Sequence, residues 1–259
     1  MYPYFHEIFA DRTGGTVFSC FGIWHIAYLI VIFGSIFLTI FCLRKRAKGS
    51  RNKAIKIALH LAFGLYMADF FLMPLAYGYI DIEKLPFHMC TLMCLLSFLS
   101  YHSLLFARWR KQFAVLGLVS NLIYVLYPAG VGWYQIHPLS YRVVQTLLFH
   151  GSMTAYGVLT LALGDEELTI QGSLRELPVI VAVTLWAMVG NAVYNGAEGE
   201  YDHMFNWFFV VRDPFYLLPA EISPYIMPFV MVLTIYVADL IICFAYLAFK
   251  KAANTAVRK

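Results

Sequence analysis

The chain has 259 residues, of which 61% are hydrophobic and 13% are charged, and its formal net charge is +4. Because soluble domains carry about a quarter charged residues, this composition excludes an ordinary soluble protein and predicts one that crosses a membrane several times. In such a protein a small basic excess encodes orientation in the bilayer, so we expect no binding to nucleic acid. The residues before Thr16 include Glu7 and Arg12 in place of a basic start and a short apolar core, which predicts no cleavable signal peptide.

Seven apolar segments are long enough to cross a bilayer as helices of about twenty residues. Basic residues end the first, the third and the seventh of them. The sequence therefore predicts an all-α, multi-pass integral membrane protein, a bundle of seven transmembrane helices that forms one domain over residues 1–259. The predicted spans are 21–43, 55–78, 86–107, 113–129, 142–163, 176–195 and 225–249.

The basic residues predict which side each loop occupies. If the amino terminus lies outside, all but four of the 19 basic residues fall on the inner side. The positive-inside rule therefore favours an outer amino terminus and a cytoplasmic carboxyl terminus. The four outer basic residues are Arg12, Lys84, Arg142 and Arg212.

The outer connection between the sixth and seventh predicted spans, about 196–224, is the longest. It contains a largely apolar octet, 204–211, which is too short to span a bilayer and is followed by Asp213 and Pro214. This pattern predicts an interfacial or re-entrant segment that could form a lid over the helix ends. An aromatic anchor at the level of the lipid headgroups is the alternative that the pattern leaves open.

Polar side chains gather near the outer ends of the predicted spans, within about three turns at 1.5 Å per residue. Ionisable groups inside a membrane are costly, so this shared depth predicts an outward-opening polar cavity. Interhelical hydrogen bonds that only hold the bundle together remain an alternative. The set comprises His25, Asp69, His88, Cys90, His150 and Asn191 in the spans, with His203 and Asn206 in the outer connection.

Cys90 and His150 are the pair with the clearest chemistry. An imidazole can take the proton of a thiol so that the thiolate attacks an acyl carbon. His88 lies two residues from Cys90, about 200° around a helix, so His150 on another helix is the better base. A packed, inert Cys90 and a disulfide between Cys90 and Cys20 are the alternatives.

A zinc site is the rival use of the same side chains, because histidine and aspartate are acceptable zinc ligands. The sequence has no compact HExxH spacing, and we expect no metal and no cofactor. The residues that such a site would draw on are His25, Asp69, His88, His150 and His203.

Several short stretches resemble the YwaF family of bacterial integral membrane proteins, which is similar to the eukaryotic transmembrane protein 164 family. The likeness covers nearly the whole chain. Its stretches are 21–25 (FGIWH), 85–90 (LPFHMC), 148–151 (LFHG), and 190–191 through 206–208 to 213–214.

That resemblance implies a phospholipid acyltransferase that uses a cysteine and a histidine, here Cys90 and His150. An acyl chain from a diacyl phospholipid would form a thioester on Cys90 and pass to a lysophospholipid. More distant relatives hydrolyse lipid esters, so water is a second acceptor. One departure is Thr91, where the resemblance predicts an acidic residue. A bacterial member would reside in the cytoplasmic membrane.

Helper roles follow from the same polar layer. Asn191 or Asn206 could donate hydrogen bonds to an oxyanion, and Asp69 or His25 could orient His150. Two other functions stay open, a zinc-dependent lipid hydrolase and a non-catalytic carrier of lipids or small molecules.

Overall fold

The computed structural model describes residues 15–78, 82–132, 135–165, 167–195 and 205–257. All regular secondary structure in these ranges is helical, which confirms the all-α fold class. Six helices are long and apolar enough to cross a membrane, so the chain is a multi-pass integral membrane protein. These candidate spans are Ile23–Leu43, Lys48–Leu75, Arg110–Gly132, Tyr141–Leu163, Ile170–Asn195 and Ser223–Ala252.

The third predicted span, 86–107, differs from the expectation. Helix α4 (Met89–His102) has 14 residues, and at 1.5 Å per residue it extends only about 21 Å. Ser103 then takes an extended conformation (φ −137°, ψ 129°) before the one-turn helix α5 (Leu104–Ala107). A hydrocarbon core is about 30 Å thick, so six candidate spans replace the seven expected within the described ranges. The side of each terminus stays a prediction.

The described chain forms two compact units. The first comprises Met1–Lys84 and Met93–Glu166, and the second comprises Leu85–Leu92 and Glu167–Lys259. Helix α4 therefore begins in the second unit and continues in the first. That residues 1–259 form a single membrane domain stays a prediction.

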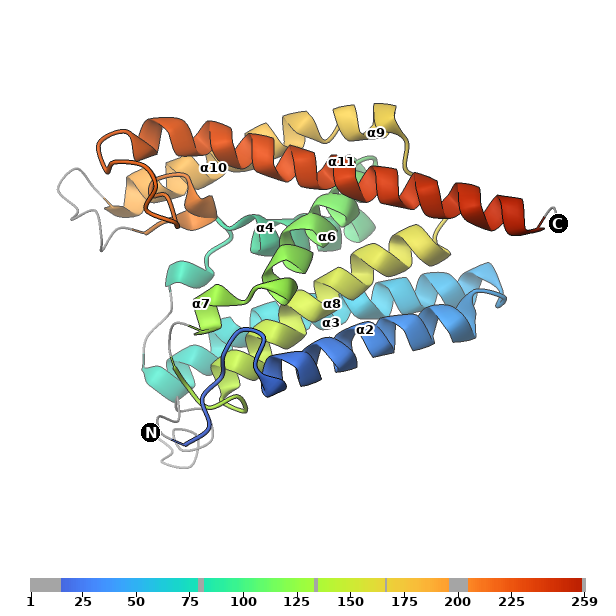
Figure 1. Cartoon of the computed structure of the whole chain (residues 1–259), viewed down its shortest axis with the longest axis horizontal. Helices are drawn as coiled ribbons and strands as arrows, with labels where there is room; N and C mark the ends of the chain where they lie inside the picture. The colour runs from blue at the N-terminus through green and yellow to red at the C-terminus, as the bar shows by residue number, and fades with distance from the viewer. Residues whose placement is uncertain (1–14, 79–81, 133–134, 166, 196–204, 258–259) are drawn as a thin grey trace. The chain divides into compact units, whose positions relative to one another are not determined.

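Helix α8 (Tyr141–Leu163) is the centre of the first unit and packs against three neighbours (Figure 1). Its glycines allow this: a Cβ at Gly157 would lie 2.5 Å from the Leu118 Cβ, closer than real Cβ atoms approach. The result is a buried helix whose inward polar residues must find partners within the protein. The neighbours are α2 (Ile23–Leu43), α3 (Lys48–Tyr77) and α6 (Arg110–Leu126). The unit also contains the short helices α7 (Ala129–Gly132), η1 (Ile82–Lys84) and α5, and α4 from Met93 onward.

The second unit pairs α10 (Leu177–Asn195) with the long α11 (Ser223–Val257). Helix α11 buries a stripe at four-residue spacing, formed by Ile235, Asp239 and Cys243, as expected for one face of a helix. Two shorter elements pack on α11, namely α9 (Ile170–Leu174) and the 3₁₀ turn η3 (Trp207–Phe209), shown in Figure 1.

Candidate functional site

His150 lies in the middle of α8 and is buried against α6. Its Nδ1 lies 2.7 Å from Oδ1 of Asn121, a fully buried residue of α6. The ring of Tyr124, one turn further along α6, stacks on the imidazole with 3.9 Å between centroids. Helix α6 therefore fixes both the tilt and the rotation of the His150 ring.

The amide of Asn121 also settles which nitrogen of His150 carries the proton. Its Nδ2 donates to the Gly117 carbonyl at 2.7 Å, so its Oδ1 faces His150. Because an amide oxygen only accepts, Nδ1 of His150 must be the donor. In the neutral ring Nε2 then holds the lone pair, as in a histidine oriented for general-base chemistry.

Asn121 was not among the predicted site residues, since its depth near the middle of a predicted span set it apart from the outer polar layer. The residues expected to orient His150, Asp69 and His25, make other hydrogen bonds. His25, in the first turn of α2, donates from Nε2 to the Val125 carbonyl at 2.9 Å and accepts at Nδ1 from the Phe21 N–H at 2.9 Å. His25 therefore ties α2 to the end of α6, and Asn121 is the observed partner of His150 Nδ1.

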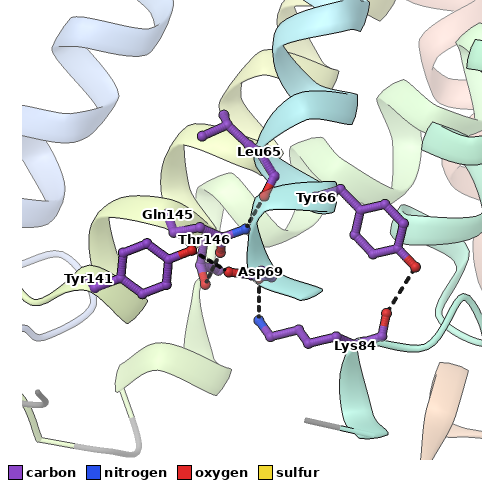
Figure 2. Close-up of polar contacts among 7 residues, drawn as sticks. All are labelled: Leu65, Tyr66, Asp69, Lys84, Tyr141, Gln145 and Thr146. Atoms are coloured by element: carbon purple, nitrogen blue, oxygen red, sulfur yellow. Dashed lines mark hydrogen bonds and ion pairs between the residues drawn. The ribbon is translucent and has the colours of Figure 1, made fainter. Parts of the chain in front are cut away.

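Asp69 is the centre of a second polar network in the first unit (Figure 2). Its carboxylate accepts from the Tyr141 hydroxyl at 2.7 Å and lies 3.4 Å from the Lys84 ammonium. Tyr66, one turn before Asp69, donates to the Lys84 carbonyl at 3.0 Å, and Gln145 donates to a carbonyl of α3 at 3.2 Å. Asp69 is only 2% exposed, so these partners offset the cost of burying its charge. The network fastens η1 and the start of α8 to α3.

Cys90 lies in the first turn of α4, in the second unit, and is partly exposed. The turn before it is held by α10. The Trp186 indole donates to the Pro86 carbonyl at 2.9 Å. A Cβ at Gly190 would lie 2.4 Å from Cδ1 of Phe87, so only glycine admits this ring. The Cys90 segment, residues 85–90, is therefore fixed directly before the thiol.

His88 precedes α4 and also helps to hold the Cys90 segment. The contacts that α10 and the loop around η3 make with this segment are called the clamp below. Its Nδ1 accepts from the Phe208 N–H at 3.2 Å. Trp207 is 1% exposed, and its ring lies 4.9 Å from that of Phe87. The apolar octet expected as a lid thus includes a 3₁₀ turn that packs on the Cys90 segment, and its first residue, Met204, lies outside the described ranges.

The asparagines proposed as oxyanion donors bond to the backbone of this loop instead. Asn191 accepts from the Trp207 N–H at 3.0 Å and donates to the Trp207 carbonyl at 3.0 Å and to the Ala187 carbonyl at 2.8 Å. Asn206 accepts from the N–H groups of Val211 and Arg212 and donates to the Arg212 carbonyl. Both amides shape the loop, so they do not support a role at an oxyanion.

The loop backbone is strained at Phe208 and Phe209, next to the bond with His88. Phe208 and Phe209 have φ values of 56° and 53°, in the left-handed region that side chains rarely adopt. Each such residue costs roughly 1–2 kcal/mol, and this conformation persists only where surrounding bonds determine it. The Asn191 bonds to Trp207 and the Phe208 bond to His88 provide that constraint.

Beyond η3, Asp213 organises the loop. Its carboxylate accepts from the N–H groups of Phe215, Leu217 and Leu218 at 2.7–3.0 Å, and its own N–H donates to Ser223. These bonds, that from Phe215 above all, hold the pKa of the Asp213 carboxyl below its usual range. The start of α11 is thereby joined to the loop.

The two alternatives from the sequence, a Cys20–Cys90 disulfide and a metal site, can now be compared with the described residues. Cys20 and Cys90 both have reduced thiols there, and no disulfide joins them. No group of three histidine, cysteine, aspartate or glutamate side chains within the described ranges is placed to hold a metal ion. His203 lies outside those ranges.

The candidate residues divide between the two units. His25, Asp69 and His150 belong to the first, whereas His88, Cys90, Asn191 and Asn206 belong to the second. That Cys90 meets His150 stays a prediction.

Comparison with known proteins identifies the family. No curated protein and no solved structure gives a match. A family model, described as the TMEM164 family, matches residues 20–248, which include the Cys90 segment, His150 and the clamping loop. The chain therefore belongs to the TMEM164 family.

Proposed function

We propose that this protein is a phospholipid acyltransferase in which Cys90 is the nucleophile and His150 is the general base. The observation that carries the proposal is the bond between His150 Nδ1 and Asn121 Oδ1. It leaves Nε2 as the basic nitrogen and gives the base a third group that orients it, as in cysteine–histidine–asparagine hydrolases.

The first half-reaction forms a thioester. His150 Nε2 takes the proton from the Cys90 thiol, and the thiolate attacks the ester carbonyl of a diacyl phospholipid. Negative charge is favoured at the N-terminus of a helix, and the first turn of α4 gives the thiolate such a place. When the tetrahedral intermediate collapses, the C–O bond of the ester breaks and His150 returns the proton to the leaving lysophospholipid oxygen.

The second half-reaction transfers the chain. The hydroxyl of a lysophospholipid loses its proton to His150 and attacks the thioester carbonyl. The C–S bond then breaks, and the proton returns to the Cys90 sulfur. Water in place of the second lipid would give a free fatty acid, which makes the same machinery a lipid hydrolase.

The clamp around the Cys90 segment supports this assignment. A nucleophile must be held close to its productive geometry, and the bonds from Trp186 and Phe208 fix the turn before Cys90 from two sides. A carrier that only binds lipid needs no such rigidity beside one thiol.

The test is intact-protein mass spectrometry after incubation with phosphatidylcholine that carries an isotopically labelled sn-2 chain. We expect the mass of one acyl chain on the wild-type protein, removable with hydroxylamine and lost when lysophospholipid is added. Cys90→Ala should show no adduct. Cys94→Ala, one turn later on α4, is the matched control and should keep it.

Full transfer activity in Cys90→Ala would overturn the proposal. Fatty acid released without any gain of acylated lysophospholipid would instead assign hydrolysis. Lipid bound without turnover would assign a carrier.

A further inference from the structure

A pocket of about 370 Å³ lies along the first turns of α3 in the first unit. The spacing of its lining residues by three and four places them on one face of the helix. This is the end of α3 next to the basic loops, away from Asp69. The lining residues are Gly49, Asn52, Lys53, Lys56, Ile57 and His60.

The basic residues of this helix start divide into two kinds. Lys48 forms an ion pair with Asp165, and Arg51 lies 3.9 Å from the same carboxylate. Lys53 and Lys56 line the pocket, and the described part of the chain places no acidic side chain within ion-pair distance of either. The pocket therefore has two positive charges that no acidic side chain of the described ranges neutralises.

His60 lines the pocket, and the rings of Tyr101 and His102 lie beside its lining residues. The Lys56 ammonium lies 5.4 Å from the centre of the Tyr101 ring, a cation–π contact that holds it in place. His60 donates from Nδ1 to the Lys56 carbonyl at 2.7 Å, and its ring lies 5.9 Å from that of His102.

Apolar surface continues from the pocket along the same face of α3. Ile57 is 57% exposed and Leu61, one turn further into the membrane span, is 55% exposed. Charged groups followed by an apolar helix face match a ligand that has an anionic head and an acyl tail. Lysines at this depth keep their stems along apolar surface and their ammonium groups at the headgroups.

We propose that this pocket binds the phosphate headgroup of an anionic phospholipid in the leaflet next to the basic loops. Lys53 and Lys56 provide the charge, and the face from Ile57 to Leu61 contacts an acyl chain. Basic residues clustered at the end of a membrane helix attract such lipids. The site is separate from Cys90 and does not depend on the proposed acyl transfer.

Native mass spectrometry of the delipidated full-length protein tests this, with titrations of phosphatidylglycerol and phosphatidylcholine of matched chains. We expect tighter binding of phosphatidylglycerol. The double variant Lys53→Gln/Lys56→Gln should weaken it roughly 10–30-fold, since each basic residue near a membrane surface contributes a several-fold effect. The control Lys45→Gln/Arg46→Gln removes the same charge from equally exposed positions that do not line the pocket, and it should bind as the wild type does.

Equal losses in the two double variants would overturn the proposal, because the effect would then come from net charge alone. A second experiment measures whether inorganic phosphate competes with phosphatidylglycerol for the pocket. If it displaced phosphatidylglycerol at equal concentration, the site would be one for a soluble anion and the lipid assignment would fail. Size-exclusion chromatography of each variant confirms that the protein remains folded.

Discussion

The two units use their buried polar side chains in different ways. In the first unit, side chains from different helices bond to each other, as His150 does to Asn121 and Asp69 to Tyr141. In the second, side chains such as Asn191 bond to the backbone of one loop. The first arrangement orients the His150 ring, whereas the second fixes the conformation of the chain beside the Cys90 segment. Changes at His150 and Asn121 should therefore affect the proposed chemistry, and a change at Asn191 should affect folding.

The largest effect is expected from His150→Gln, which replaces the imidazole with an amide of similar size and so removes the base. General acid–base catalysis contributes about 10²–10⁴-fold, so transfer should fall by that factor. The measurement is the initial rate of transfer of a labelled sn-2 chain in micelles, beside a melting curve. A wild-type rate in a folded variant would exclude His150 as the base.

Variants of Asn121 test whether the orientation of His150 matters for catalysis. Asn121→Ala should reduce the rate by roughly 10–100-fold, because misplacing a catalytic group by about 1 Å can have that effect. Asn121→Asp places a carboxylate against Nδ1, which favours the imidazolium form of His150. Its pH–rate profile should rise at higher pH than the wild-type profile. A purely structural role for Asn121 predicts no such shift.

In the second unit, Asn191→Leu should lower the free energy of unfolding by about 2–4 kcal/mol, because it leaves the buried N–H and C=O of Trp207 without partners. Asn195 is the matched control: it makes the same pair of bonds to Phe205, at 2.9 and 2.6 Å, at a partly exposed position. Water can replace those bonds, so Asn195→Leu should cost less. Equal losses in denaturant titrations would contradict the comparison.

A smaller decrease in the free energy of unfolding is expected from Lys84→Met. This change leaves the buried Asp69 carboxylate with the Tyr141 hydroxyl but without its cation. Because Lys84 is partly exposed, water restores some solvation, and the expected cost is about 1–3 kcal/mol in the same titrations. A variant as stable as the wild type would show that the ion pair contributes nothing to the fastening of η1.

The smallest effect concerns Asp213 and pH. The stabilisation from its carboxylate is fully present above the pKa of an unfolded aspartate, about 3.9, and is lost as pH falls through the lower pKa of the folded loop. Hydrogen exchange at Phe215, Leu217 and Leu218 should therefore lose protection at acid pH in the wild type. In Asp213→Asn the protection should be lower at neutral pH and independent of pH.

Hydropathy and charge predicted most helices because a span needs a long apolar run. Three of the expected segments match candidate spans at nearly the same bounds, namely those of α2, α8 and α11. The expected segments 55–78 and 176–195 also match candidate spans, but those spans begin earlier, at Lys48 and Ile170. The predicted span 113–129 also matches one, within Arg110–Gly132. The segment 86–107 is as apolar as the others, so composition could not reveal that α4 ends at His102 and that Ser103 is extended.

The candidate site was predicted less completely. Depth along a span indicates which polar groups share a layer, but not which face of each helix they occupy or which bonds they make. Asn191 and Asn206 were expected in the outer polar layer, but their amides bond to the backbone of a loop. The conformation of that loop could not be predicted from the sequence. The partner of His150, 29 residues earlier in the chain, depends on the packing of α6 against α8 in the same way.

The indole of Trp186 has one consequence for experiment. Its Nε1 donates to the Pro86 carbonyl, and its ring stacks on Phe87 with 5.1 Å between centroids, in the turn directly before Cys90. The chain has five tryptophans, so a variant that keeps only Trp186 would emit from the turn that precedes Cys90. Loading and unloading of a lipid chain could be followed in real time by fluorescence, without any attached dye.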